Sequence, residues 1–248
     1  MCIRDRYINC CRIGGTLYGL PNNRDFAAGW DSYALRKDIL NKYNIKASDI
    51  KNIKDLEKVF DLVLEKENGV VPLACTGSLF GNFSLADGIN SLVSGGHENY
   101  GQEDEVVDIF ETEEYKNRLK QVRKWYLKGY MGDNILENTS TITEMIRNGE
   151  AFAETVKNKP GMKMQESLKC EREMEIVQFG QPAISYNSMA AFPWMITKNS
   201  ISPELSMKLL NLFYSDEDIM NLLAYGIEGI DYVETCLLYT SDAADDLT

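Results

Sequence analysis

The chain has 248 residues, of which 38 are acidic and 26 basic, so its formal net charge is −12 at pH 7. An acidic surface repels phosphate, and this balance argues against a nucleic-acid binder. The 44% of hydrophobic residues can bury a core, no apolar run reaches the length of a membrane span, and the length allows one large domain or two lobes.

The two ends of the sequence resemble translated sequencing adapter. Met1 to Asp5 can be encoded by DNA whose reverse complement, read one base out of frame, lies within codons for residues 236–241. Natural termini have no reason to be related in this way. We therefore expect residues 1–6 and 236–248 to be adapter-like scars outside the fold, and the acidic balance persists without them.

The first part of the chain predicts a strand, two helices and a second strand. Residues 15–21 indicate a short strand that ends in a turn. Apolar residues then recur at helical spacing in two runs, the second clearer than the first. Gly69 ends the second helix, and residues 70–73 start an extended stretch. The first run comprises Leu35, Ile39, Leu40 and Tyr43, and the second comprises Leu56, Val59, Phe60, Val63 and Leu64.

The middle of the chain predicts two further helices. A long one spans residues 112–129 and has one apolar face. A shorter one starts at Thr141, whose spacing from Glu144 is that of a capping box, and stops at Gly149. The residues expected on the buried face of the long helix are Tyr115, Leu119, Val122 and Tyr126.

The last part predicts three strands and two helices. The strands cover residues 151–156, 174–179 and 190–197. One helix starts at Ser202 with proline in its first turn, and the next is capped by Ser215 or Asp216. Such alternation of strands and helices predicts an α/β fold. The residues expected on the buried stripes are Leu205, Leu209, Leu212 and Phe213, then Ile219, Leu222 and Leu223.

Motifs for catalysis or metal binding are missing from the sequence. Gly95-Gly96-His97 lacks the lysine and hydroxyl residue of a phosphate-binding loop, and His97 is the only histidine. We expect no catalytic residue, no metal and no cofactor, although the many carboxylates leave a glycosidase pair open. The cysteines outside the adapter-like ends lack metal-ligand spacing and are expected to be free or buried thiols. They are Cys10, Cys11, Cys75 and Cys170.

Aromatic residues at loop or strand-edge positions are the more informative group. Sugar rings pack their C–H faces on aromatic rings, while Asp, Asn and Arg satisfy the hydroxyl groups, so the group is compatible with a carbohydrate site. The alternative is that most of these rings belong to the core. The group consists of Tyr18, Trp30, Tyr33, Phe80, Phe83, Tyr186, Phe192 and Trp194.

Several segments, in their order and spacing, carry a resemblance to a known family. They are GGTLYGLPNNRDFAAGW, RKDILNKYNI, DLEKVFDLVLEKE, FETEEYKNRLKQVRKWYLKGYM, NGEAFAETVKNKPGM and LLNLFYSDEDIMNLLAYGIEGIDYV. Together they resemble the extracellular solute-binding proteins of ABC importers, carbohydrate-type family 1, and most of all its Gram-positive lipoprotein branch. The resemblance spans residues 13–233.

The resemblance implies an incomplete α/β fold of the periplasmic-binding-protein-like type II, in which two lobes close over a ligand. Residues 7–22 would form part of lobe 1, residues 23–177 lobe 2, and residues 178–235 the return to lobe 1. Family members also carry a lipoprotein signal and a lipid-modified cysteine, which this sequence does not show. As written, the chain is expected to bind ligand poorly and to expose apolar surface.

The resemblance also implies ligand-binding residues. Arg24 and Asp25 follow the hinge strand and are the first candidates for hydrogen bonds to ligand hydroxyls; alternatively, they pair with each other or brace the hinge. Trp194 is expected in the core rather than in the site. The remaining candidates are Trp30, Phe80, Phe83, Asn158, Lys159, Tyr186 and Phe192.

The function implied is that of a receptor and not of an enzyme. A monomeric solute-binding protein would hold a carbohydrate, and more specifically an oligosaccharide, and deliver it to the transmembrane subunits of an ABC permease. The full-length protein would be lipid-anchored at the extracellular face of the cell membrane. Two alternatives stay open: a receptor for a peptide or another polar solute, and a glycoside hydrolase that uses an Asp/Glu pair.

Overall fold

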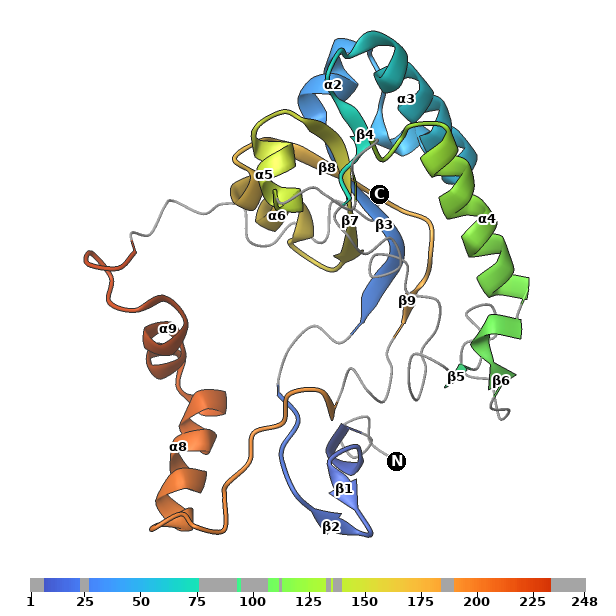
Figure 1. The fold of residues 1–248 in the computed structure, drawn as a ribbon. Helices are drawn as coiled ribbons and strands as arrows, with labels where there is room; N and C mark the ends of the chain where they lie inside the picture. The colour runs from blue at the N-terminus through green and yellow to red at the C-terminus, as the bar shows by residue number, and fades with distance from the viewer. Residues whose placement is uncertain are drawn as a thin grey trace. The chain divides into compact units, whose positions relative to one another are not determined.

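The chain divides into two compact units, which are described separately (Figure 1). Unit 1 consists of Met1–Arg24 and Ser188–Thr248, and unit 2 is Asp25–Asn187. The computed structural model describes residues 7–22, 27–75, 93–94, 107–111, 113–132, 135, 140–183 and 190–232.

Unit 2 is built on a five-stranded mixed sheet. Strand β3 (Ala28–Arg36) lies between β7 (Ala151–Asn158) and β8 (Met174–Gln178) and is antiparallel to both. Strand β4 (Val71–Leu73) pairs in parallel with β7, and β9 (Pro182–Ala183) pairs with the start of β3. The expected lobe boundary after residue 177 lies inside unit 2, and the assignment of residue ranges to the two lobes stays a prediction.

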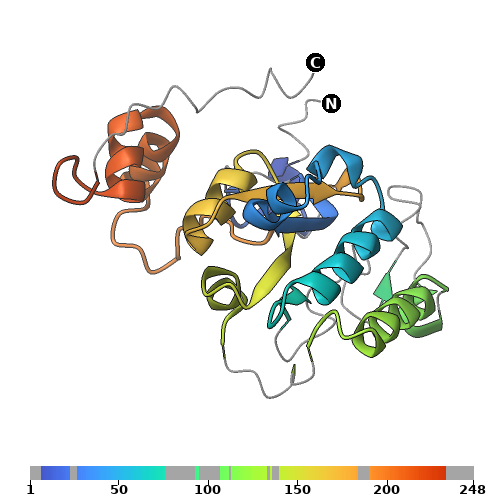
Figure 2. The ribbon, with the colours of Figure 1, turned by 90° about the horizontal axis from the view of Figure 1, so that it is seen from above.

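Helices cover both faces of this sheet. On one side, α3 and α4 pack on the larger core cluster, and on the other side α5 and α6 pack on a smaller one (Figures 1 and 2). The helices of unit 2 are α2 (Lys37–Lys42), η1 (Ala47–Asp49), α3 (Ile53–Lys66), η3 (Ile109–Glu111), α4 (Glu113–Leu127), α5 (Ile142–Arg147) and α6 (Met162–Cys170). Strands β5 (Val93–Ser94) and β6 (Val107–Asp108) pair with each other as a separate two-stranded antiparallel sheet.

Strand β3 was not predicted. The sequence assigned Leu35 to a helix, but Leu35 is the penultimate residue of β3, and helix α2 starts only at Lys37. Tyr33 and Leu35 lie in the larger core cluster while Ala34 lies in the smaller one, so the strand is apolar on both faces. A strand buried on both sides lacks the alternation of apolar and polar residues that marks a half-exposed strand.

Other predicted elements of unit 2 are confirmed. Helix α3 and strand β4 form where the apolar pattern placed them. The capping box of α5 is present, because the Glu144 amide donates to Thr141 Oγ1 at 3.2 Å and the Thr141 amide donates to Glu144 Oε2 at 2.7 Å. Strands β7 and β8 coincide with the predicted ones, whereas helix α6 was not predicted.

Helix α4 forms as predicted, and its buried face agrees with the prediction only in part. Val122 is buried as expected, but Leu119 and Tyr126 are exposed, the latter by 49%. Trp125, which was not expected on this face, is buried. Trp125 packs edge-on against Phe60 with ring centroids 5.6 Å apart, and its Nε1 donates to Glu57 Oε1 at 2.8 Å. The largest side chain of the helix therefore sets its orientation.

Unit 1 contains little sheet within its described residues. Strands β1 (Arg12–Ile13) and β2 (Thr16–Leu17) form a short hairpin, and Leu20 makes an isolated bridge to Trp194. The strand predicted at 190–197 is reduced to that bridge, next to Pro193, which has no N–H to donate. Trp194 packs on Phe213, with ring centroids 5.6 Å apart.

The two helices predicted in unit 1 form where the pattern placed them. They are α8 (Pro203–Ser215) and α9 (Glu217–Tyr225), and Asp216 caps α9 through the Ile219 amide at 3.1 Å. The predicted burial of their stripes is wrong in this structure. Leu205, Leu209, Leu212, Leu222 and Leu223 are exposed, and among the described residues of α8 and α9 only Leu210 is buried.

Two further findings concern the whole described part of the chain. Cys10, Cys11, Cys75 and Cys170 are buried thiols and are not in disulfides, as predicted. None of the helices described is both long enough and apolar enough to traverse a lipid bilayer.

Candidate functional site

One end of the unit 2 sheet gathers polar side chains from three strands. Because β7 and β8 run antiparallel to β3, their last residues, Asn158 and Gln178, lie beside the start of β3. Asn158 Nδ2 donates to Gln178 Oε1 at 2.7 Å, and Gln178 Nε2 donates to the carbonyl of Gly180 at 2.8 Å. Two amide side chains are thus held in fixed orientations at this sheet end.

Gly29 lets the backbone of β3 approach this amide pair. Gly29 is the register partner of Asn158, and a Cβ at its position would lie 2.2 Å from Oε1 of Gln178. Any larger residue would displace the Gln178 side chain. The glycine therefore leaves room for the Gln178 amide in its present position, and its backbone angles do not call for glycine.

A bulge in β3 follows directly. The register with β7 shifts between Gly29 and Ser32, and Asp31 within it has a positive φ of 47°. A non-glycine residue in this region costs on the order of 1 kcal/mol, so the surroundings must hold it there. The carbonyl of Asp31 accepts from the Phe179 amide at 3.1 Å, and its carboxylate forms an ion pair with Arg118 of α4. Ser32 Oγ donates to the Gly29 carbonyl at 3.1 Å.

The core beneath this sheet end is aromatic. Tyr33 follows the bulge and is buried against Phe179 and Trp125, at centroid distances of 5.8 and 6.2 Å. Burial, and after it the Asp31 carboxylate, raise the pKa of Tyr33 well above its ordinary value, so this phenol stays neutral. The polar side chains of the sheet end are therefore supported by rigid, uncharged core residues.

The predicted ligand-binding residues are only partly covered by the structure. Asn158 and Lys159 lie at the sheet end, Trp30 is part of β3, and Phe192 lies in unit 1 with an exposed side chain. The structure brings Asn158 together with Gln178 and Gly29, which the sequence did not single out. The predicted residues Arg24, Asp25, Phe80, Phe83 and Tyr186 lie outside the described residues.

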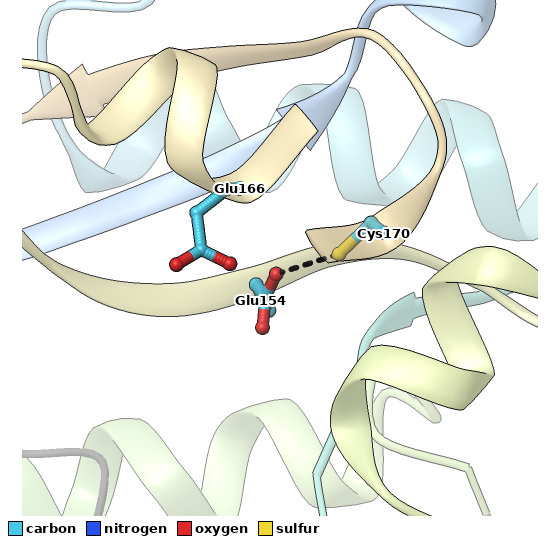
Figure 3. A group of neighbouring side chains, drawn as sticks. All are labelled: Glu154, Glu166 and Cys170. Atoms are coloured by element: carbon cyan, nitrogen blue, oxygen red, sulfur yellow. Dashed lines mark hydrogen bonds between the residues drawn. The ribbon is translucent and has the colours of Figure 1, made fainter. Parts of the chain in front are cut away.

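A second cluster, away from the sheet end, is buried between β7 and α6 (Figure 3). The potential ligand atoms of Glu154, Glu166 and Cys170 all lie within 4.8 Å of one another, and both carboxylates are almost inaccessible, at 2% and 4% exposed. Lys169 Nζ lies 2.8 Å from Glu166 Oε2 and 3.5 Å from Glu154 Oε2, so an ammonium group already supplies the positive charge.

The protonation of this cluster also fits a polar interior better than a metal centre. Cys170 Sγ donates to Glu154 Oε1 at 3.3 Å, and burial together with Glu154 raises the pKa of the Cys170 thiol to about 12. A metal would need the thiolate. Burial, and to a lesser degree Glu166, raises the pKa of Glu154, which favours the neutral form of that carboxyl group.

Comparison with known proteins confirms the predicted resemblance. No protein-family model matches the chain. It is similar to a carbohydrate ABC transporter substrate-binding protein of Streptococcus pneumoniae serotype 4, with 25% identity over 228 residues, which are 90% of this chain and 45% of that protein. The chain thus spans about half the length of the curated relative it matches.

The fold is similar to that of solved solute-binding proteins. The N-glycan transport solute binding protein NgtS from S. pneumoniae aligns with a TM-score of 0.77 and 23% identity over 90% of this chain and 49% of that one. Its complex with Man5GlcNAc aligns over the same shares with a TM-score of 0.68 and 23% identity. The chain therefore has part of a two-lobe solute-binding-protein fold, as predicted.

Proposed function

We propose that this chain is part of an extracytoplasmic receptor that holds an oligosaccharide between two lobes and delivers it to an ABC permease. The observation that carries the proposal is the similarity of 90% of the chain to a carbohydrate ABC transporter substrate-binding protein. The fold shared with NgtS supports it, since NgtS is crystallised with glycans. A lipid anchor at the outer face of the membrane, a monomeric state and contact with permease subunits are parts of the same proposal.

The sheet end of unit 2 has the chemistry that a sugar requires. Sugar hydroxyls both donate and accept hydrogen bonds, and carboxamides offer both functions in a fixed plane. Asn158 and Gln178 supply two carboxamides, and Lys159 adds a cation directly after β7. We propose that Asn158, Lys159 and Trp30 contact ligand from unit 2, and that Arg24, Asp25, Phe80, Phe83, Tyr186 and Phe192 complete the site.

The buried carboxylate pair of unit 2 gives no support to the alternative of a glycoside hydrolase. A retaining glycosidase needs two carboxyl groups about 5 Å apart on either side of an accessible glycosidic bond. Within the described ranges, Glu154 and Glu166 have a comparable separation, but they are buried and paired with Lys169. A sugar cannot enter between them.

Ligand-induced stabilisation tests the proposal. The full-length protein that contains residues 7–235 would be heated with Man5GlcNAc, with other oligosaccharides and with short peptides. A specific ligand raises the melting temperature progressively with concentration, because binding to the folded state stabilises it by about 2.7 kcal/mol at a hundredfold excess over Kd. A shift with peptides and none with oligosaccharides would overturn the carbohydrate assignment, and release of a shorter sugar would overturn the receptor assignment.

A matched pair of variants tests the sheet end. Asn158→Ala removes a proposed ligand contact and should weaken glycan binding about tenfold, the usual effect of losing one hydrogen bond of about 1.4 kcal/mol. Asn148→Ala removes an exposed amide that bonds only locally, to Glu150, and should leave affinity unchanged. Equal affinities of the two variants would exclude Asn158 from the site.

A further inference from the structure

We propose that the ion pair between Asp31 and Arg118 is a positioning pair that sets how the start of β3 faces ligand. The inference rests on the proposed function and adds to it two residues that the sequence did not select. It is carried by the bulge in β3, by the backbone conformation of Asp31 and by the origin of Arg118 on a different element, α4.

The register shows what the bulge does. On β3 three residue steps separate Gly29 from Ser32, whereas on β7 two steps separate their partners Asn158 and Val156. The bulge therefore inserts one extra residue into β3. Since side chains alternate between the faces of a sheet, one extra residue exchanges the faces of everything that precedes it. Without the bulge, Gly29 could not pair with Asn158 while Ser32 pairs with Val156, so the start of β3 would be out of register with the end of β7.

Asp31 is the residue that holds this bulge. Its φ of 47° is disfavoured for a residue with a Cβ, and aspartate is among the few residues that tolerate it. The Phe179 amide donates to the carbonyl and Arg118 pairs with the carboxylate, so backbone and side chain are restrained by two different neighbours. The two side chains are only 22% and 18% exposed, which shields the pair from solvent screening.

Helix α4 presents Arg118 from a fixed position. Seven residues further along, Trp125 is fully buried and bonded to Glu57 of α3, and Lys124 Nζ lies 2.6 Å from the same carboxylate. Two turns of rigid helix therefore connect the anchored part of α4 to the arginine. The ion pair transmits the position of α4 to the bulge.

Hydrogen exchange of this chain tests the positioning role without any ligand. The variants are Arg118→Met, Asp31→Ala and Asp31→Asn, and the control is Lys116→Met, which breaks an exposed pair with Glu113 on the same helix. Arg118→Met and Asp31→Ala should accelerate exchange at least tenfold at the amides of 29–33 and at Phe179, while the rest of the β7 and β8 amides exchange as before. Asp31→Asn should be intermediate, because asparagine tolerates the positive φ but carries no charge.

Glycan affinity of the full-length protein tests the link to ligand binding. Arg118→Met and Asp31→Ala should weaken Man5GlcNAc binding about tenfold, Arg118→Lys should recover part of the loss, and Lys116→Met should have no effect. Uniformly faster exchange throughout unit 2, or exchange equal to that of Lys116→Met, would overturn the positioning role. Local acceleration with unchanged affinity would overturn its role in binding. If the unaltered protein binds no oligosaccharide, the proposed function fails, and the exchange experiment still decides the role of the ion pair in the bulge.

Discussion

The structure and the sequence pattern differ on which residues of helix α4 are buried, and mutations can distinguish between them. The pattern places Tyr126 on the buried face, whereas the structure buries Trp125 and leaves Tyr126 half-exposed. Truncating Trp125 to alanine empties the space between Tyr33, Phe60 and Tyr130, whose ring centroids lie 5.3 to 6.3 Å from their partners in this group. Removing a fully buried tryptophan costs about 3–5 kcal/mol.

A milder variant measures how much the hydrogen bond of Trp125 contributes to this loss of stability. Trp125→Phe keeps an aromatic ring and removes the Nε1 donor to Glu57, which retains Lys124 at 2.6 Å and Gln121 at 3.0 Å. Because the carboxylate keeps two donors, the loss is that of one hydrogen bond to a charged group plus a smaller ring, about 2 kcal/mol. The order of stability should be wild type, Trp125→Phe, Trp125→Ala.

Urea unfolding followed by circular dichroism at 222 nm measures both effects. With a slope of about 2 kcal/mol per M, Trp125→Ala should lower the midpoint by about 2 M and Trp125→Phe by about 1 M. Tyr126→Ala is the control and should shift it by less than about 0.5 M, because the side chain is 49% exposed. If Tyr126→Ala destabilises as much as Trp125→Ala, α4 packs through the face that the sequence predicted, and the reasoning is refuted.

Three further predictions concern other parts of the chain. Burial raises the pKa of Glu154, so the contribution of this group to stability is present at pH below 4.5 and is lost as the pH rises through the raised pKa. Glu154→Gln should therefore increase the urea midpoint at pH 8 and reduce the change of the midpoint between pH 5 and 8. A midpoint at pH 8 lower than that of the wild type would contradict this prediction. Gly29→Ala should cost about 1–3 kcal/mol by overpacking on Gln178, and adding Gln178→Ala should recover most of the loss in the same assay. Leu209→Ser with Leu222→Ser should cost less than about 1 kcal/mol in total while reducing binding of a hydrophobic dye, because both side chains are exposed; a larger cost would mean that they are packed in solution.

The elements that the sequence predicts well are those whose signals are local. The capping box of α5 involves residues three positions apart, and the apolar stripe of α3 repeats within one helix. Strand β3 fails this condition. It packs against cores on both faces, and Leu35 continues at helical spacing into Ile39 and Leu40 of the next helix. Arg36, which precedes α2, makes no capping hydrogen bond from its side chain, so the boundary has no residue that would mark it.

The residues of the candidate site also differ in whether a local sequence signal could identify them. The resemblance selects Asn158 because family members place contacts after the corresponding strand, and in the structure Asn158 lies at the sheet end; its contact with ligand stays a prediction. Its partner Gln178 is 20 residues away in sequence, and Asp31 and Arg118 are separated by 87. No spacing rule connects residues so far apart. The available signal was a glycine and an aspartate on either side of a tryptophan, within an otherwise apolar stretch, which is typical of a bulge.

The exposed stripes of α8 and α9 show what helical periodicity can and cannot specify. The repeat of Leu205, Leu209 and Leu212 correctly predicts that a helix forms and that these side chains share a side of it. It says nothing about what covers that side, because burial requires a partner surface. The strand pairing in the described part of unit 1 is limited to a two-stranded hairpin and two isolated bridges. In unit 2 the same type of stripe on α3 is buried, since a five-stranded sheet lies beneath it. Periodicity therefore predicts faces, and only the tertiary fold decides which faces become core.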